Sequence, residues 1–128
     1  MILKNHANNK KQRQDWSAYY KSETCRRVGI NPELPLIICG YQPEPQHSWN
    51  ADSGKYDGPV NGYGYWVNQW VKDSQGNTWL QNPVMVVVDG NQPIDFQFGQ
   101  KVKFDQMGAY YSRKKYQYLF RAKGIRNV

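Results

Sequence analysis

Apolar and polar residues alternate over much of the second half of the chain, a pattern typical of strands with one buried face. The clearest run covers residues 62–72 and is predicted to form one long strand. Its first face carries Tyr63, Tyr65, Val67 and Val71, and its second face carries Trp66 and Trp70. A strand with aromatic residues on both faces is either sandwiched or exposes one aromatic face to solvent. Because the first face already fills a core, we expect Trp66 and Trp70 to be exposed.

Further strands are predicted along the rest of the chain. Residues 73–77 have turn composition, so 62–72 and 78–88 should form a hairpin, with a bulge or edge at Pro83. The most apolar stretch, 84–88, should be a central strand. After a turn at 89–91, the inward residues are predicted to be Ile94, Phe96, Phe98, Val102 and Phe104.

The last predicted hairpin pairs residues 108–112 with 116–125 through the basic turn 113–115. Strand alternation divides its second arm into an apolar face and a basic face. The core side is predicted to hold Tyr116, Tyr118, Phe120 and Ala122, and the solvent side Lys115, Gln117, Leu119, Arg121 and Lys123. The cations would then form a stripe on the surface.

The N-terminal half is less regular. Residues 1–15 read as a mobile basic arm, and Trp16, Tyr19 and Tyr20 share one face of a helix expected from about Asp15 to Arg27. A short strand is predicted within 34–41, followed by a long loop at 42–61.

Five to seven strands at short spacing with one helix favour a mainly β fold. We predict a small antiparallel barrel of OB-like type with a short N-terminal helix. Residues 16–128 would form a single domain that follows the arm at 1–15.

The chain has a net charge of +7, and its charged residues are distributed unevenly along the sequence. Residues 101–128 hold eight Lys/Arg and one Asp, residues 1–28 are also basic, and the middle of the chain is mildly acidic. This division favours a localised polyanion site, with nucleic acid or an anionic membrane surface as candidates. The membrane interpretation is weaker because the basic segments have strand periodicity.

Other features narrow the class of protein. The N-terminus has no apolar stretch of secretory type, which favours a cytoplasmic protein with Cys25 and Cys39 as free thiols. The glycines match no nucleotide-binding motif, and the His and Cys residues are not at ligand spacing. We therefore expect no cofactor and no metal.

Catalytic combinations are few. Glu33, Glu44 and His47 could supply the acid and base of a small basic ribonuclease, with Arg113 or Arg121 stabilising the transition state. The only support for a ribonuclease is that these residue types occur in the same chain. A non-enzymatic protein is therefore the preferred interpretation.

A binding surface is better supported, because cations neutralise phosphates and aromatic rings stack on unpaired bases. The candidate nucleic-acid-binding residues are Lys101, Lys103, Arg113, Lys114, Lys115, Arg121, Lys123, Trp66, Trp70 and Tyr110.

The segment from Pro93 to Phe104, the step Gly108–Tyr110 and the closing segment Tyr118–Ile125 together resemble small proteins of bacterial integrative and conjugative elements. That family shows an "FG.KV.F" stretch, a "G.Y" step and a "Y.F.A..I" strand, and a member looks like a helicase accessory. The resemblance covers roughly the last third of the chain and implies an OB-like barrel that binds single-stranded DNA.

The sequence thus predicts a DNA-binding protein, with single-stranded DNA favoured, in replication or conjugative transfer of a mobile element. A helicase or another replication or transfer protein would be its partner. One alternative is a phage or plasmid interaction module, or inhibitor, that presents a basic surface to a protein. The other is the small ribonuclease.

Overall fold

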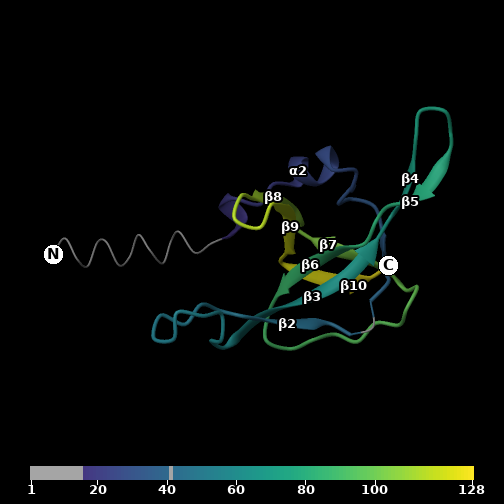
Figure 1. Ribbon diagram of the computed structural model, residues 1–128. Helices are drawn as coiled ribbons and strands as arrows, with labels where there is room; N and C mark the ends of the chain where they lie inside the picture. Colours follow the sequence, from purple (N-terminus) through teal and green to yellow (C-terminus); the bar gives the residue numbers. More distant parts are fainter. Residues whose placement is uncertain (1–15, 41) are drawn as a thin grey trace.

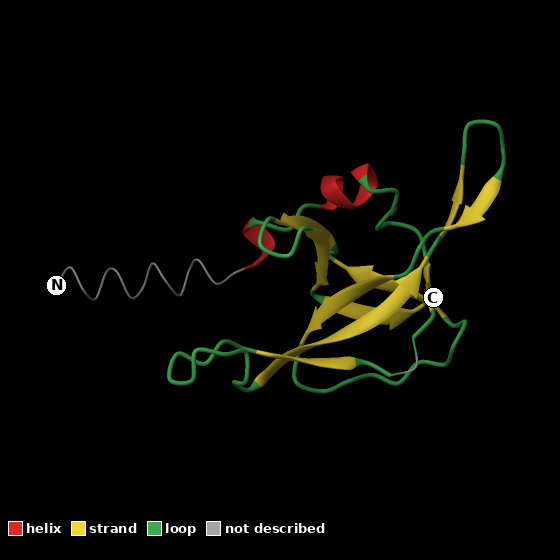
Figure 2. Ribbon diagram, viewed as in Figure 1, coloured by secondary structure: helices red, strands yellow, loops and turns green. Residues whose placement is uncertain are grey.

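The computed structural model describes residues 16–40 and 42–128, and over these residues the protein is mainly β (Figures 1 and 2). The predicted arm at 1–15 lies outside the described residues. Two short helices precede the strands, a 3-10 turn η1 (Trp16–Ala18) and the helix α2 (Ser22–Arg27). The strands are β1 (Leu36–Ile38), β2 (Glu44–His47), β3 (Val60–Asn68), β4 (Trp70–Lys72), β5 (Thr78–Leu80), β6 (Val84–Asp89), β7 (Lys101–Asp105), β8 (Gly108–Ser112), β9 (Gln117–Ala122) and β10 (Gly124–Asn127).

Eight of the strands that we describe form one sheet, in the order β10-β7-β1-β3-β6-β9-β8 with β2 also paired to β3, and β4 and β5 form a separate two-stranded sheet. The four strands β7-β1-β3-β6 are joined by antiparallel pairs, and β7 returns to lie beside β1. This is the spatial order of a Greek key. The pairing of β6 with β9 is parallel, whereas the other strand pairs that we describe are antiparallel, so the sheet is mostly antiparallel.

The last four strands behave as one bent hairpin. Gly108 pairs with Arg121 in β8–β9, and the same register continues to Asp105 paired with Gly124 in β7–β10. The Lys123 amide donates to the Asp105 carbonyl at 2.8 Å, which carries the ladder across the bend. One half of this hairpin therefore pairs with β6 and the other half with β1. The described sheet nevertheless has two edge strands, β10 and β8, which do not pair with each other. The mainly β fold is therefore confirmed, while the closed barrel remains a prediction.

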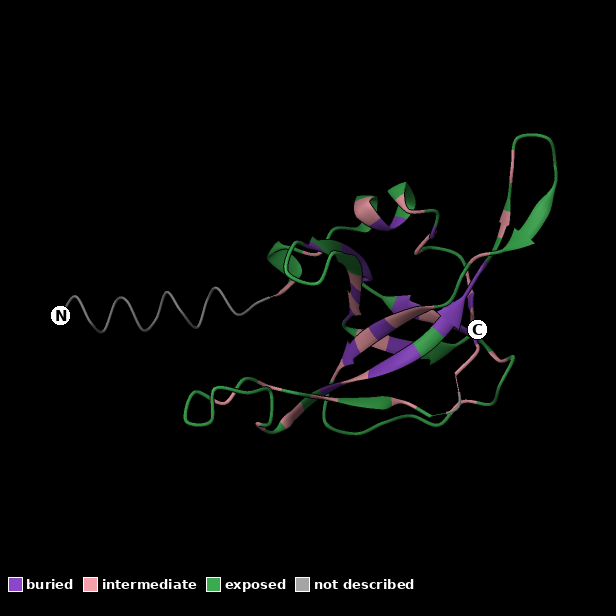
Figure 3. Cartoon of the chain, in the orientation of Figure 1, coloured by how far each residue is buried: buried purple, intermediate pink, exposed green. Residues whose placement is uncertain are grey.

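The core lies between the strands and beneath α2 (Figure 3). Inward positions alternate along β1, β3, β6, β7 and β9, as the pleat of a strand requires. The buried apolar residues are Cys25, Ile30, Leu36, Ile38, Tyr65, Val67, Val86, Val88, Val102, Phe104, Met107, Ala109, Phe120, Ala122 and Ile125. Cys25 and Cys39 are free thiols, as expected.

Several element boundaries differ from the prediction. The expected single helix is broken, because Lys21 exchanges backbone hydrogen bonds with Ala109 of β8. Gly108 permits this approach, since a Cβ there would lie 2.6 Å from the Tyr20 carbonyl. The predicted strand 62–72 is two strands, β3 and β4, interrupted at Gln69.

Two further segments have a different secondary structure from the one predicted. The loop expected at 42–61 contains β2, which adds to the edge of β3 with an irregularity between Gln46 and His47. Residues 94–98 form a loop instead of a strand. There Phe96 packs on the core while Phe98 is exposed, so alternation did not indicate a strand.

Candidate nucleic-acid interface

A groove of about 1070 Å³ lies over the outer face of β3, β6 and β9. Its walls come from β2 and the segment after it, from the 81–83 connection and from the turn before β9. The lining residues include His47, Trp49, Tyr56, Trp66, Met85, Val87, Lys115, Tyr118 and Arg121. Residues far apart in sequence are thus brought to one concave surface, which is the usual shape of a ligand site.

Trp49 and Tyr56 form one aromatic wall. Their ring centroids are 5.0 Å apart in an edge-to-face arrangement, although both side chains are largely exposed. A short turn holds them: the Asn50 amide donates to the Lys55 carbonyl at 2.8 Å. Sequence reasoning missed these two residues, and the only available signal was the presence of two aromatics in a polar loop.

Trp66 projects outward from β3, opposite the buried Tyr65 and Val67, and is 38% exposed. Its indole Nε1 donates to the carboxylate of Glu44 on the neighbouring β2. A Cβ at Gly40 would lie 2.7 Å from the Trp66 Cβ, so the absence of a side chain at Gly40 leaves room for the indole. The ring is thereby held in one orientation while part of its surface stays open.

Tyr118 forms the opposite aromatic wall, and here the sequence prediction was wrong. It was expected in the core with Tyr116, but Tyr118 is 42% exposed and Tyr116 is 83% exposed. The β6 ladder reaches only Phe120–Ala122 of β9, so the start of β9 extends past the core. Tyr118 instead packs on Tyr111, its cross-strand partner, at 5.0 Å.

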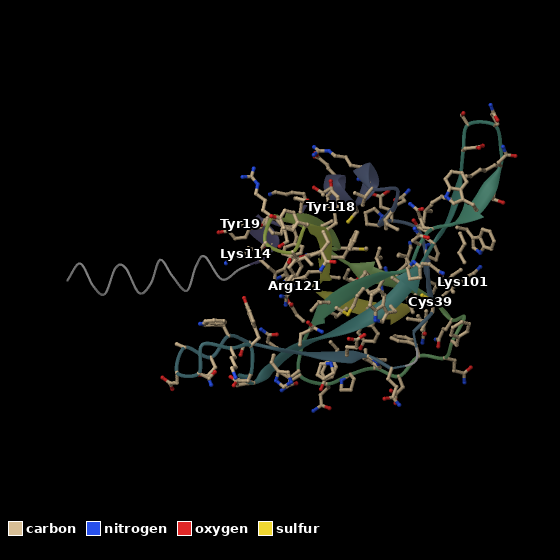
Figure 4. All side chains as sticks on the ribbon, in the orientation of Figure 1. Tyr19, Cys39, Lys101, Lys114, Tyr118 and Arg121 are labelled. Carbon is tan, nitrogen blue, oxygen red and sulfur yellow. The ribbon has the colours of Figure 1, made fainter. Side chains whose placement is uncertain are left out.

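The predicted basic stripe is divided between two places. Arg113, Lys114 and Lys115 are exposed in the turn between β8 and β9, and Lys115 lines the groove. Lys101 and Lys103 lie on β7, where Lys103 pairs in register with Arg126 of β10. Figure 4 places Lys101 near Cys39, well apart from Lys114, Tyr118 and Arg121.

Arg121 lies in the groove wall, but its guanidinium already forms an ion pair with another residue of the chain. Its guanidinium is 2.8 Å from the carboxylate of Asp89, and Lys123 approaches the same carboxylate at 3.8 Å. Trp16 donates from its indole Nε1 to Asp89 at 2.9 Å. The Trp16 ring also lies under both cations, 4.6 Å from the Lys123 Nζ and 5.4 Å from the Arg121 Cζ. This cluster fixes Trp16, the first described residue, beside the groove.

Two aromatic candidates lie outside the lining. Trp70 is on the β4–β5 hairpin, which projects away from the sheet (Figure 1). Tyr110 packs against Tyr20 at 5.5 Å, which covers part of its ring. Trp66 is therefore the one predicted stacking residue that lies in the groove.

The predicted ribonuclease residues are dispersed. Glu33 pairs with Arg26 of α2 at 3.3 Å, and Glu44 holds the Trp66 indole. The Nδ1 atom of His47 lies 2.8 Å from the Gly58 carbonyl. His47 and Arg121 share the groove lining, whereas Glu33 and Glu44 do not take part in it.

Over the part of the chain that is described, no helix has the length and apolar character needed to cross a membrane. In the same part, no three His, Cys, Asp or Glu side chains gather as a metal-binding set. Comparison with protein-family models, with curated proteins and with solved structures finds no match for this chain.

Proposed function

We propose that this protein binds single-stranded nucleic acid, with DNA favoured, in the groove over β3, β6 and β9, and that it does so without catalysis. The observation that carries the proposal is that exposed aromatic rings from three separate segments, Trp49 with Tyr56, Trp66, and Tyr118, line one groove. Unpaired bases stack on such rings, each contributing about 1–3 kcal/mol. Bases inside a duplex have no free faces for this contact, which favours a single strand.

Charge supports the same proposal. Lys115 lines the groove, and Arg113 and Lys114 lie beside it in the same exposed turn. A phosphate backbone that follows the groove past this turn would gain from the release of condensed counterions. Arg121 should attract phosphate less strongly than an unpaired arginine, because its charge is already neutralised by Asp89.

We further propose that the strands form a partly open Greek-key barrel of OB-like type. Two facts favour this: the order β7-β1-β3-β6, and the bent final hairpin that pairs with both β6 and β1. In such barrels the face of the second and third strands binds oligonucleotides, together with the loops after the first and fourth strands. The corresponding parts here are β3 and β6, residues 42–59, and the turn at 113–116, and all three contribute to the groove.

The biological setting of the proposal rests on the C-terminal resemblance alone. We propose that the protein acts on DNA of a mobile element during its replication or conjugative transfer, in the cytoplasm, together with a helicase or similar protein. Purification of the tagged protein from its host, with and without nuclease, followed by identification of the retained proteins, tests this part separately: recovery of a helicase in both cases would support it, and its absence would contradict it.

The central experiment is a titration of fluorescently labelled oligonucleotides, comparing single-stranded DNA, duplex DNA and single-stranded RNA of equal length. Each titration is repeated at several salt concentrations. We expect the tightest binding to single-stranded DNA, with a log–log salt slope of about −0.7 for each phosphate neutralised. Absence of binding to single strands, or an affinity that does not change with salt, would contradict the proposal.

A further inference from the structure

Tyr116 has the most exposed aromatic ring in the described part of the chain, at 83%. It lies in the turn that joins β8 to β9, directly after the three basic residues of that turn. Its neighbours Lys115 and Gln117 line the groove, whereas Tyr116 is not among the lining residues. The Tyr116 ring is therefore placed at the rim of the groove and not inside it.

The backbone of Tyr116 is left-handed, with a φ angle of 53°. A residue with a bulky side chain rarely adopts this conformation, and Gly or Asn ordinarily fills turn positions that require it. Because the ring is barely covered, packing within the chain does not offset the strain. A tyrosine at this position is thus unfavourable for the fold, and such departures from local turn chemistry are expected at functional positions.

The turn that carries Tyr116 is anchored at both ends. Ser112 pairs in register with Gln117, which closes the β8–β9 ladder. The Lys115 amide also donates a hydrogen bond to the Ser112 Oγ atom at 3.2 Å, and Ser112 is buried. These contacts hold the turn, and with it the backbone of Tyr116, in a fixed place beside the groove.

The basic residues before Tyr116 keep their charge available. Arg113, Lys114 and Lys115 are exposed, and none of them takes part in an ion pair within the described residues. Arg121 differs, because Asp89 pairs with it inside the groove wall. The turn therefore combines unpaired cations, which attract phosphates, with a ring on which a base can stack.

We propose that Tyr116 stacks on a base of the single strand where the strand leaves the groove, so that the binding site extends onto the 113–116 turn. This inference rests on the proposed function and adds a contact to the same site. Tyr118 lines the groove two residues further along, so the Cα atoms of the two tyrosines are at most about 7 Å apart. A strand that contacts Tyr118 thus passes within reach of Tyr116.

Titration of single-stranded DNA oligonucleotides of about 4 to about 20 nucleotides tests the extension. The wild-type affinity should rise with length until the strand covers both the groove and the turn. Tyr116→Asn should equal the wild type on the shortest strands, which the groove alone holds, and bind the longest strands about 5–150-fold more weakly. The salt slope should not change, because this substitution removes no charge.

Urea unfolding supplies a second measurement that a structural role would move differently. Asn tolerates the left-handed backbone, so Tyr116→Asn should unfold at the same urea concentration as the wild type or at a higher one. Gln106→Asn is the matched control: Gln106 is exposed, has a φ angle of 51° and lies in the β7–β8 turn outside the groove lining. It should behave alike in urea and leave the affinity unchanged at every length. Tyr116→Phe keeps the ring and should retain the affinity.

Equal affinities of wild type and Tyr116→Asn at every length would overturn the inference and leave the groove as the whole site. A loss of affinity accompanied by a loss of stability would also overturn it, because the ring would then support the fold. Absence of binding by the wild type at every length would overturn the proposed function itself, so the two failures are distinguishable.

Discussion

The guanidinium of Arg121 lies 2.8 Å from the carboxylate of Asp89, so a cation in the groove wall is neutralised from within the chain. Both side chains are largely covered, and the Trp16 indole donates a hydrogen bond to the same Asp89 carboxylate. Asp89 is therefore expected to stabilise the fold while it weakens attraction to phosphate.

Replacing Asp89 with Asn should lower the free energy of unfolding by about 1–3 kcal/mol, because it removes a charged acceptor from a partly buried cluster. The same change frees Arg121, so affinity for single-stranded DNA should rise and the salt slope should steepen by about 0.7. Urea unfolding and oligonucleotide titration measure the two effects. Asp105→Asn is the matched control, since the exposed Asp105–Arg126 pair should contribute less than about 1 kcal/mol. A weaker affinity in a folded Asp89→Asn protein would contradict this account.

Trp66 should contribute directly to base stacking. Trp66→Ala is expected to weaken binding of a short single-stranded oligonucleotide by about 5–150-fold, corresponding to the loss of about 1–3 kcal/mol. Trp66→Phe keeps an aromatic face and should retain most of the affinity. Trp79→Ala serves as the control outside the groove. Equal losses in Trp66→Ala and Trp79→Ala would argue against the groove as the stacking site.

The two basic regions should differ in their effect on salt dependence. Lys115→Ala removes a cation that lines the groove, so the magnitude of the salt slope should fall by about 0.7. Lys101→Ala removes a cation on β7, far from Lys114 in Figure 4, and should leave the slope unchanged. Titrations at four salt concentrations separate the two cases. A larger effect of Lys101 would move the interface to the β7–β10 side of the sheet.

Cys25 predicts a loss of stability at high pH. Burial raises the pKa of its thiol from 9.0 to about 11. Because the neutral thiol is favoured in the folded state, its contribution is fully present below the unfolded pKa and is lost between about pH 9 and about pH 11. Two pKa units correspond to a loss of at most about 2.7 kcal/mol. Urea unfolding across this range should show a smaller decline in Cys25→Ala than in the unchanged protein, and an equal decline would contradict the assignment.

Local pattern was sufficient for much of the architecture. Alternation identified β3, β7, β8 and β9, and it placed Tyr65 and Val67 inside and Trp66 outside, because the pleat of a strand fixes which side chains share a face. Composition located the turns at 73–77 and 113–115, since few residue types adopt turn conformations easily. The uneven charge followed directly from the sequence.

Pattern alone therefore predicted most of the strands and the face that most of their side chains occupy, although it missed β2 and placed a strand at 94–98 where the chain forms a loop. Which strands are neighbours depends on tertiary packing, and this pairing changed the site. Tyr118 became a groove residue because β6 ends its pairing at Phe120, and Arg121 lost its free charge because Asp89, 32 residues earlier, lies beside it. Trp49 and Tyr56 joined the groove because β2 adds to β3. Contacts of this kind depend on long-range packing, for which strand periodicity carries no information.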